Sequence, residues 1–546
     1  MFGQKEYIIW GAGGVGKRFL EKYRELEIAY VVDGNGEKKG QDFFGYTIFL
    51  PDDIDNWKRY CVIITSTFYS EIKKFLEKKG LLEYRDFWSY KNIVNLSSME
   101  KLKNQVCYFI KELERKSRRL SKIVLLLGKL NGEHKKNVSL YLNRLAEVDK
   151  EHHWIFLSES SFGEQNAWFP SMEVLFMPDL FLQNQYKSDA VMPDIAEDSL
   201  EDNLKDAAYA MQFGVDGMPL EYAYYICKEA EKFYGQVLEI LKPEQVYIWN
   251  AFAPLHKVFT KVCEEKGTEV IYVENGVLPG TLAFDKNGQM GESVPAVCCK
   301  KFCQIPVGLE ERRHAKEVLN FLKGSGLNRY RQKEDAGFIQ SVKDKLLLGR
   351  PVILFAGGLD HMSGLVPHNK KAEKYHSPIF GTSEEAACYL KELSQKNGWN
   401  LIYKAHPWLP SLMESDEGGF VCLNKGNIND LIDLSDVVVT IVSQVSYLAL
   451  IRKKPVVMLG YIQLRQQGCT YEAFKKEIVE DILAKAIQDG FRKEMEEAFL
   501  THVARLEKVY LYDDMADKGI QIGRDISQLT MWEPDSAEEE CVWQKK

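Results

Sequence analysis

A carboxylate and an imidazole each stand at the end of an apolar run of the kind that forms a buried strand. Glu274 is the last residue but one of the run EVIYVEN. Lys404 ends the run NLIYK, and His406 and Pro407 follow it. A carboxylate in that position can accept the proton of an attacking hydroxyl. A histidine and a lysine can stabilise the negative charge that develops on a departing phosphate. We therefore predict that Glu274 and His406 are catalytic. The alternatives are a glutamate that only forms an ion pair and a histidine with a structural role.

The turn after Glu274 offers further candidates for the acceptor side of such a reaction. Asn275 and Gly276 leave the strand, and the glycine lets the chain turn close to a substrate. Asp285 follows in the same loop as a second candidate carboxylate. A separate turn, FAGGLDH, carries Gly357 and Gly358, which could approach a donor, and a weaker acidic candidate, Asp360.

Serines follow another apolar run and mark the start of a helix. The segment VTIVSQVSYLAL places Ser443, Gln444 and Ser446 at that start. Hydroxyls and free backbone N–H groups at a helix N-terminus bind phosphate oxygens. These residues, with Lys404 and Pro407, are the predicted nucleotide-binding set; simple helix capping by Ser443 is the alternative.

The N-terminal segment GAGGVG is a glycine loop between an apolar run and a helical pattern. Its glycines are Gly11, Gly13, Gly14 and Gly16, and Asp33 ends the next strand. The backbone of such a loop can approach a pyrophosphate, and the acid can bind a ribose. The same glycines also serve a tight turn without any ligand. The loop thus predicts a nucleotide or nucleotide-sugar, a nicotinamide dinucleotide, or an empty structural domain.

Short apolar runs separated by helix-length stretches predict parallel sheets. They occur at residues 7–10, 29–32 and 61–65, again at 122–128, 154–159, 246–250 and 269–275, and a third time from 351 to 460. The fold class is therefore α/β. We expect a Rossmann-like domain at 1–96, a helical connector at 97–121, an acceptor-side lobe at 122–345, a donor-side lobe at 346–505, and a C-terminal helix with an acidic tail at 506–546.

Composition limits the possible partners. With 71 basic and 79 acidic residues the net charge is −8, so nucleic acid is disfavoured. No run approaches the roughly 18 apolar residues that span a bilayer, and the eleven cysteines show no metal spacing, so we expect reduced thiols in a cytoplasmic protein. A basic cluster could touch a membrane surface peripherally, or be a solvated helix face: Arg115, Lys116, Arg118, Arg119 and Lys122.

The motifs ENG at 274–276, KAHP at 404–407 and VSQVSYLAL with KPVVMLG at 442–460 resemble bacterial capsule-polysaccharide glycosyltransferases, including CMP-Kdo and CMP-sialic acid transferases. That resemblance spans roughly residues 122–500 and implies a GT-B pair of Rossmann-like lobes. It implies that Glu274 is the acid/base, His406 binds phosphate and Ser443 belongs to the nucleotide site. Asn275 departs from the family pattern, which has an acid there.

The segment from Asp33 to Ile54, DGNGEKKGQDFFGYTIFLPDDI, resembles the N-terminal domain of sugar O-acyltransferases of the PglD type. The likeness covers about 95 residues and implies a nucleotide-sugar site or a structural module, without hydride transfer.

The combined expectation is a glycosyltransferase that moves a sugar from a nucleotide-sugar, with a CMP-activated acidic sugar favoured, to an oligosaccharide or glycolipid acceptor. No metal or other cofactor is required, because no DxD element stands at a strand end. The alternatives are a CDP-polyol phosphotransferase, an NAD(P)-dependent oxidoreductase that uses the N-terminal domain, and a non-catalytic capsule assembly protein.

Overall fold

The computed structural model describes residues 6–23, 26–66, 68–81, 86–90, 109–111, 113–128, 135–158, 169–177, 202–215, 218–328, 336–416, 418–514 and 518–534. These residues form two compact units, one within residues 6–111 and one within residues 113–534. Most of the predicted connector, the acidic stretch near residue 190 and the acidic tail lie outside the described residues.

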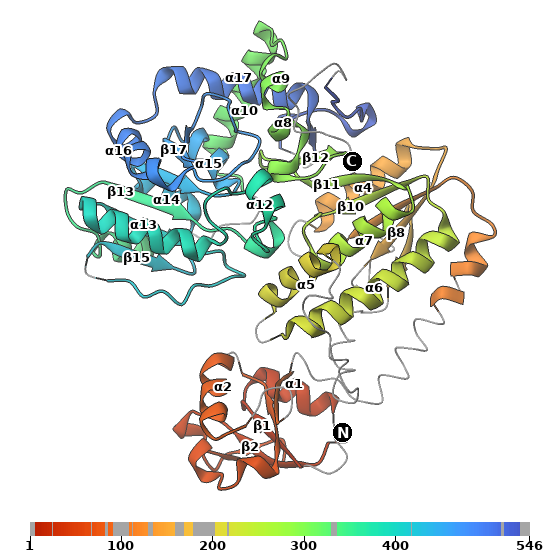
Figure 1. Ribbon diagram of the computed structural model, residues 1–546, viewed down its shortest axis with the longest axis vertical. Helices are drawn as coiled ribbons and strands as arrows, with labels where there is room; N and C mark the ends of the chain where they lie inside the picture. Colours follow the sequence, from red (N-terminus) through yellow and green to blue (C-terminus); the bar gives the residue numbers. More distant parts are fainter. Residues whose placement is uncertain are drawn as a thin grey trace. The chain divides into compact units, whose positions relative to one another are not determined.

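The first unit is a Rossmann-like sheet with the strand order β3-β4-β2-β1-β5-β6 (Figure 1). Its strands pair in parallel except β3 with β4. β1 and β5 are buried along their whole length, which explains why they read as continuous apolar runs. The bounds are β1 Tyr7–Trp10, β2 Ile28–Val32, β3 Asp42–Phe43, β4 Tyr46–Phe49, β5 Cys61–Ile64, β6 Phe87–Ser89, α1 Gly14–Lys22 and α2 Tyr69–Lys78.

The second unit begins with a lobe whose sheet has the order β19-β12-β11-β10-β7-β8-β9. The strands from β11 to β9 are parallel, and β12 and β19 add an antiparallel edge. The strands are β7 Ile123–Gly128, β8 His153–Ser158, β9 Glu173–Phe176, β10 Gln245–Trp249, β11 Glu269–Asn275, β12 Thr281–Asp285 and β19 Leu511–Asp513. The helices are α4 Lys135–Val148, α5 Asp202–Gly214, α6 Leu220–Leu241, α7 Pro254–Glu265, α8 Val294–Val297 and α9 Cys299–Cys303.

The same unit contains a second lobe, whose sheet is parallel throughout in the order β15-β14-β13-β16-β17-β18. Its strands are β13 Val352–Ala356, β14 Asn400–Lys404, β15 Phe420–Leu423, β16 Val437–Thr440, β17 Val456–Met458 and β18 Tyr471–Glu472. Its helices are α10 Leu309–Ser325, α11 Ala336–Lys343, α12 Lys370–Tyr375, α13 Ser383–Asn397, α14 Ile428–Leu434, α15 Val445–Ile451, α16 Val479–Asp489 and α17 Lys493–Val509.

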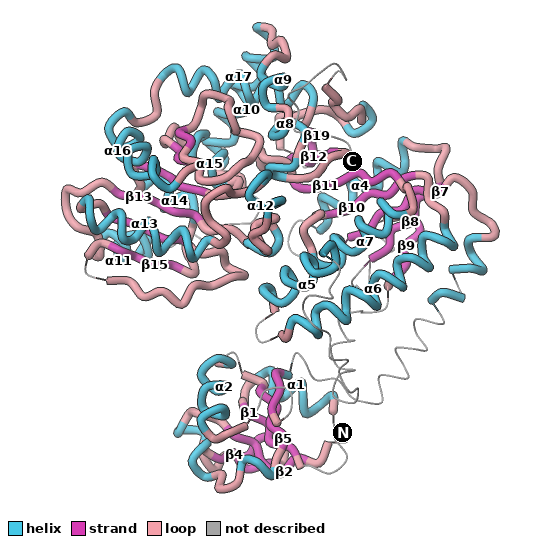
Figure 2. The backbone as a smooth tube through the Cα atoms, in the orientation of Figure 1, coloured by secondary structure: helices cyan, strands magenta, loops and turns pink. Residues whose placement is uncertain are grey.

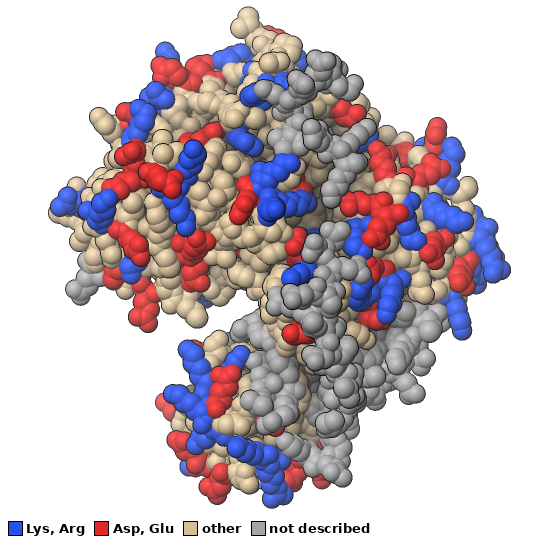
Figure 3. Space-filling model, viewed as in Figure 1, with Lys and Arg blue, Asp and Glu red and all other residues tan. Residues whose placement is uncertain are grey.

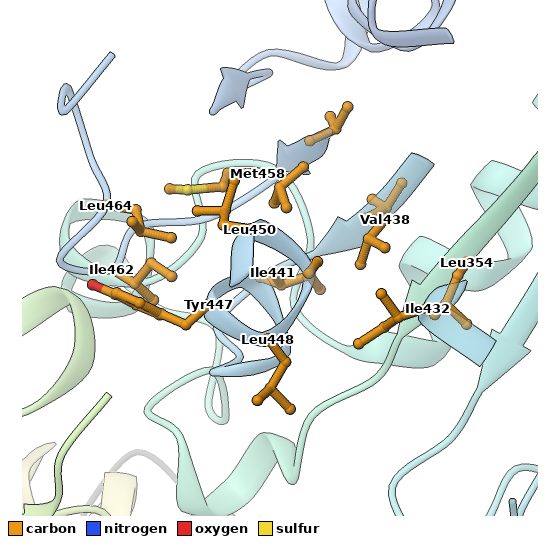
Figure 4. Close-up of a cluster of buried hydrophobic side chains, with 14 of the residues drawn as sticks. Leu354, Ile432, Val438, Ile441, Tyr447, Leu448, Leu450, Met458, Ile462 and Leu464 are labelled. Atoms are coloured by element: carbon orange, nitrogen blue, oxygen red, sulfur yellow. The ribbon is translucent and has the colours of Figure 1, made fainter. Parts of the chain in front are cut away.

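The core of the second lobe fixes the short helix α15 beside the sheet. Tyr447 is fully buried, and Figure 4 shows it among Ile462 and Leu464, which come from the loop after β17. Ile441 and Leu450 belong to the same cluster. The turn that precedes α15 therefore rests on a packed apolar base at the carboxyl edge of the sheet.

The α/β prediction, with an N-terminal Rossmann-like domain and a GT-B pair of Rossmann-like lobes, is confirmed. Every predicted strand is present, as the magenta segments of Figure 2 show, with bounds that differ by at most a few residues. The sequence did not predict the short strands β3, β4, β6, β9, β15 and β18. It also missed β12 and β19, whose pairing closes one edge of the first lobe's sheet.

Two segments lie elsewhere than the predicted boundaries imply. Helix α10, assigned by sequence to the first lobe, packs against α15 and α17 of the second lobe. The region from residue 506 is not a continuing helix, because α17 ends at Val509 and the chain then forms β19 in the first lobe's sheet. The chain therefore crosses between the lobes twice.

The described helices, surface charges and cysteines point to no particular binding partner. Among the described helices, none combines the length and apolar character that crossing a lipid bilayer requires. The face shown in Figure 3 mixes acidic and basic side chains. Eight of the described cysteines carry free thiols, whereas Cys298 is disulfide-bonded, so the expectation of reduced thiols throughout was wrong at that residue.

Gly291 provides a test of the packing between the two lobes. It lies in a 3-10 turn at Met290–Glu292, where a Cβ atom would overlap the carbonyl oxygen of Tyr375 and approach that of Tyr461 at 2.7 Å. Backbone atoms cannot give way as flexible side chains do, so we expect Gly291→Ala to cost about 1–3 kcal/mol of unfolding free energy. Thermal melting of the full chain measures this as a lowered Tm.

The matched control is Gly324→Ala in α10, where an added Cβ atom meets nothing within 4 Å. This change should leave the Tm equal or raise it, since alanine favours a helix over glycine by about 0.5–1 kcal/mol. Equal melting of both variants would contradict the proposed close contact at Gly291.

Candidate functional site

Three predicted motifs meet at one edge of the second lobe's sheet. β14, β13 and β16 are neighbours, and their carboxyl ends lead into the loops at His406, Gly357 and Ser443. Ala356 at the end of β13 is in register with Lys404 on one side and Thr440 on the other. Strand order reverses at β13, and ligands of parallel sheets bind at such a reversal. The loop with His406 and Pro407 (the HP motif) and the turn with Ser443 and Gln444 (the serine motif) therefore lie on either side of the glycine turn.

Lys404 is a buried cation at this edge. Its side chain is 6% exposed, and its Nζ donates a hydrogen bond of 2.8 Å to the carbonyl oxygen of Ala405. Within the described residues no carboxylate forms an ion pair with it. Burial lowers the pKa of Lys404 to about 8. A buried ammonium group without a protein anion is suited to an anionic ligand.

His406 is neutral near pH 7 and presents one nitrogen as a donor. Burial, with the nearby charges of Lys404 and His361, lowers its pKa to about 4. The backbone N–H of Trp408 donates to His406 Nδ1 at 3.2 Å, so Nδ1 is the unprotonated nitrogen and Nε2 carries the hydrogen. Pro407 is exposed in the same turn. The imidazole can thus donate a hydrogen bond to a phosphate oxygen without being charged.

The serine motif contacts the ENG motif of the first lobe. The side-chain amide of Gln444 donates to the carbonyl oxygens of Asn275 and Gly276, at 3.2 and 2.7 Å. Ser443 is half-buried, and its Oγ accepts a hydrogen bond from Val445 N at 3.3 Å. The two motifs, 168 residues apart in the sequence, are therefore joined by hydrogen bonds to main-chain oxygens.

Gly276 is required by the hairpin that follows Glu274. Its N–H donates to the carbonyl oxygen of Thr281 at 2.7 Å, closing the hairpin between β11 and β12. A Cβ atom at this position would overlap the hydroxyl of Thr281. Space within the hairpin therefore demands a glycine, and the prediction that this glycine lets the chain turn close to a substrate stays a prediction.

Glu274 lies on β11 next to this hairpin, opposite Ala283 of β12, and is half-buried. The charges of Glu274 and Asp285 act on Tyr510, a buried residue at the point where the chain returns from the second lobe to the first. Glu274 therefore lies close to this point, where the two lobes meet.

Three predicted site residues have structural partners instead. Asp285 is buried and accepts backbone hydrogen bonds from Asn287, Gly288 and Val294, while burial raises its pKa to about 7. Asp360 accepts from the backbone N–H and the hydroxyl of Ser383 at the start of α13, and burial raises its pKa to about 6. Both carboxylates hold loops in place.

Ser446 is fully buried, and its hydroxyl lies 2.7 Å from that of Thr440. It therefore faces the core rather than a ligand. Gly358 N donates to Ser383 Oγ, and Gly357 N donates to the carbonyl oxygen of Lys404, so the glycine turn is tied to both neighbouring loops.

Two basic residues near this site were missed by sequence reasoning. His361, one residue after the predicted Asp360, touches Gly214 at the end of α5 in the first lobe. Lys257 lies in the first turns of α7, after β10, and donates to the carbonyl oxygen of Val366 at 3.3 Å. His361 follows the predicted glycine turn, whereas Lys257 lies inside a helix and no sequence signal marks it.

The glycine loop of the first unit divides into two pairs. Gly11 has a φ of +129° and lies against Thr65, and a Cβ on Gly16 would overlap the carbonyl oxygen of Gly11. The fold itself requires these two glycines. At Gly13 and Gly14 an added Cβ would meet nothing within 4 Å, so no packing against the described residues demands them.

Asp33 is engaged by the loop that it was predicted to serve. Its carboxylate accepts from Ala12 N, Asn35 N and Lys38 Nζ, at 2.9, 2.9 and 2.8 Å. Burial acts to raise its pKa, but these hydrogen bonds and the charge of Lys38 hold the pKa below its ordinary value. A ribose would have to share this carboxylate with Lys38.

Comparison with known proteins gives one family match. Residues 3–86 match the family described as C2185-like, N-terminal. That range covers the first unit up to β6 and leaves the two lobes outside it. No curated protein sequence matches the chain.

Several solved structures are distantly similar. KpsC of Thermosulfurimonas dismutans, a beta Kdo 2,7 transferase, is 17% identical over 47% of this chain and 80% of its own, with a TM-score of 0.30. A trehalose-phosphate synthase of Burkholderia vietnamiensis is 10% identical over 71% and 96%, with a TM-score of 0.37. A UDP-GlcNAc 2-epimerase of Neisseria meningitidis is 11% identical over 69% and 93%, with a TM-score of 0.27. At these values the similarities carry no argument about activity.

Within the described ranges, no three or more His, Cys, Asp or Glu side chains are grouped to hold a metal ion. The expectation that no metal is required stays a prediction.

The protonation of His406 can be measured directly. We expect the imidazole to stay neutral, with its hydrogen on Nε2, from about pH 5.5 to about pH 8, because burial and nearby positive charge oppose protonation. Nitrogen chemical shifts of histidine-labelled protein report the state of each ring, and His406→Asn assigns the signal.

His314 is the internal control in the same spectra. Its hydrogen bond to Glu507 raises its pKa above the ordinary value, so it should titrate near neutral pH while His406 does not. Titration of His406 with an ordinary pKa of about 6.5 would show that its surroundings do not exclude charge.

Proposed function

We propose that the protein is a GT-B glycosyltransferase that moves a sugar from a nucleotide-sugar to a hydroxyl group of a growing surface or capsular polysaccharide. The observation that carries this proposal is the pairing of Lys404 with the neutral His406 beside the glycine turn. Both groups are donors at the strand-order reversal, and Lys404 has no ion-pair partner within the described residues. This arrangement suits the phosphate of a leaving nucleotide.

In the proposed reaction the acceptor oxygen attacks the anomeric carbon, and the bond from that carbon to the phosphate oxygen breaks. Glu274 takes the proton of the attacking hydroxyl. Lys404 and Nε2 of His406 stabilise the negative charge that the departing nucleotide phosphate acquires. The contact of Gln444 with Asn275 and Gly276 supports this assignment, because it links the acceptor-side turn to the donor-side loop.

A CMP-activated acidic sugar is the proposed donor. Support comes from the three motifs that resemble CMP-sugar transferases of capsule synthesis, of which Glu274, His406 and Ser443 carry the expected residue types. Asn275 departs from them, but its main-chain carbonyl, rather than its side chain, accepts the hydrogen bond from Gln444. A CDP-polyol donor of teichoic-acid type would use the same phosphate contacts.

For the N-terminal unit we propose a nucleotide or nucleotide-sugar ligand at Gly13 and Gly14. The open space around both glycines supports this role. Asp33 is already bound by Lys38 and by the loop backbone, so the ribose of any nucleotide, a nicotinamide dinucleotide included, would have to share its carboxylate.

The proposed acceptor is an oligosaccharide or glycolipid, with peripheral membrane contact as part of the proposal. Within the basic cluster, Lys116 pairs with Glu173 and Lys122 with Glu151. Arg118 and Arg119 are exposed and form no ion pair within the described residues. These two arginines remain as candidates for an anionic headgroup.

Glu274→Gln tests the chemical role of the carboxylate. We expect kcat to fall about 10²–10⁴-fold, because the general base is lost, while the affinity for the donor changes little. Release of CMP from CMP-sugars by the purified full chain measures both values. The same assay with CDP-polyol and UDP-sugar donors identifies another nucleotide if CMP is wrong.

Glu269→Gln, at the other end of the same strand, is the matched control and should leave kcat unchanged. The proposal is refuted if a correctly folded protein releases nucleotide from none of these donors, or if both glutamine variants are equally active.

A further inference from the structure

The loop after β13 connects the two lobes next to the candidate site. His361 lies against Gly214 of α5, and its ring centroid is 6.0 Å from that of Phe213. Further along, Asn369 Nδ2 donates to Asp206 Oδ2 at 2.8 Å. Residues 357–376 of the second lobe are therefore in direct contact with helices α5 and α7 of the first lobe.

Lys257 is the cation that the first lobe contributes to this contact. Its Nζ donates one hydrogen bond, to the carbonyl oxygen of Val366 at 3.3 Å, and forms no ion pair within the described residues. Burial lowers the pKa of Lys257 to about 8. An ammonium group has three hydrogens to donate, so this group retains capacity for a ligand.

The carboxylates in the neighbourhood are committed to other groups. Glu292 binds His376 Nε2 and Lys371 Nζ, each at 2.9 Å. Asp206 accepts from Asn369. Within the described residues neither forms an ion pair with Lys257, although the charges of Asp206 and Glu292 act on it.

His361 is linked by packing both to Lys257 and to the phosphate-site residues. It lies in the 3-10 turn Asp360–Met362, which packs on α5, and α5 packs on α7, the helix of Lys257. The same loop begins at Gly357, whose N–H donates to the carbonyl oxygen of Lys404. Nδ1 of His361 is buried and has no hydrogen-bond partner within the described residues.

We propose that Lys257 and His361 form a second anion-binding subsite, built from both lobes, beside the Lys404 and His406 pair. It binds a second negatively charged group of the donor: the carboxylate of an acidic sugar or a second phosphate. A single unpaired cation would suffice for a nucleoside monophosphate, whereas two cations on facing lobes match a donor with two negative groups. This inference rests on the proposed function and narrows its donor class.

The experiment measures the Kd of three ligands with the full chain by calorimetry. CMP carries only the phosphate, CDP adds a second phosphate, and CMP-N-acetylneuraminic acid adds a carboxylate. Lys257→Met should weaken CDP or the CMP-sugar by about tenfold or more, and CMP by no more than about twofold. If the variant loses affinity only for the CMP-sugar, the subsite binds the carboxylate. If it loses affinity only for CDP, the subsite binds the second phosphate.

Lys266→Met, at the end of the same helix and paired with Glu239, is the matched control and should bind all three ligands as the wild type does. Lys257→Arg should restore most of the selective affinity. His361→Gln provides a second, independent variant should Lys257→Met fold poorly, and it should show the same selective loss.

The inference is overturned if Lys257→Met and His361→Gln bind all three ligands like the wild type, or if they weaken CMP as much as the larger ligands. If His406→Ala still abolishes CMP binding, the proposed function stands although this inference fails. Absence of binding of all three ligands to the wild type overturns this inference and the cytidine-nucleotide donor, and the assay with UDP-sugar donors then decides the proposed sugar transfer.

Discussion

The strand order of the three sheets determines where a ligand can bind, because the first strand along the chain lies inside each sheet. The first strand of each sheet, β1, β7 or β13, has later strands on both sides. The connecting loops must then leave in opposite directions, which opens a space at the carboxyl edge. In the first unit that edge carries the glycine loop and Thr65, and in the second lobe it carries Gly357, Lys404 and the serine turn. The same rule of chain topology thus places these motifs, whereas the ENG motif lies at the end of β11, which β10 separates from β7.

The two lobes of the second unit are joined through main-chain atoms as well as through side-chain pairs such as Glu292 with His376. Gln444 binds two carbonyl oxygens, Lys257 binds a third, and Gly291 passes against a fourth. None of these contacts involves the side chain of His406. The contact with Tyr375 also explains the glycine at position 291, since a Cβ atom there would overlap the Tyr375 carbonyl oxygen.

The sequence was sufficient to predict the sheets and the motif-bearing loops, because buried parallel strands are continuous apolar runs. It was insufficient for β19 and for the placement of α10, which depend on contacts between residues far apart in the chain. Among site residues, residue type alone could not separate Asp285, Asp360 and Ser446, whose partners are backbone or core groups, from Lys404, which lacks an anion. Lys257 and His361 became candidates only when the contact between the lobes was known.

The return of the chain to the first lobe restricts how the two lobes can move. Two bodies joined by a single connection can turn about any axis, but two connections leave easy rotation only about the line through both. One connection runs from β12 toward α10, and the other is the buried Tyr510 between α17 and β19. Because the charges of Glu274 and Asp285 act on Tyr510, the ENG carboxylate stands close to this hinge axis. Opening the lobes would then displace a donor held at Lys404 much farther than it displaces Glu274.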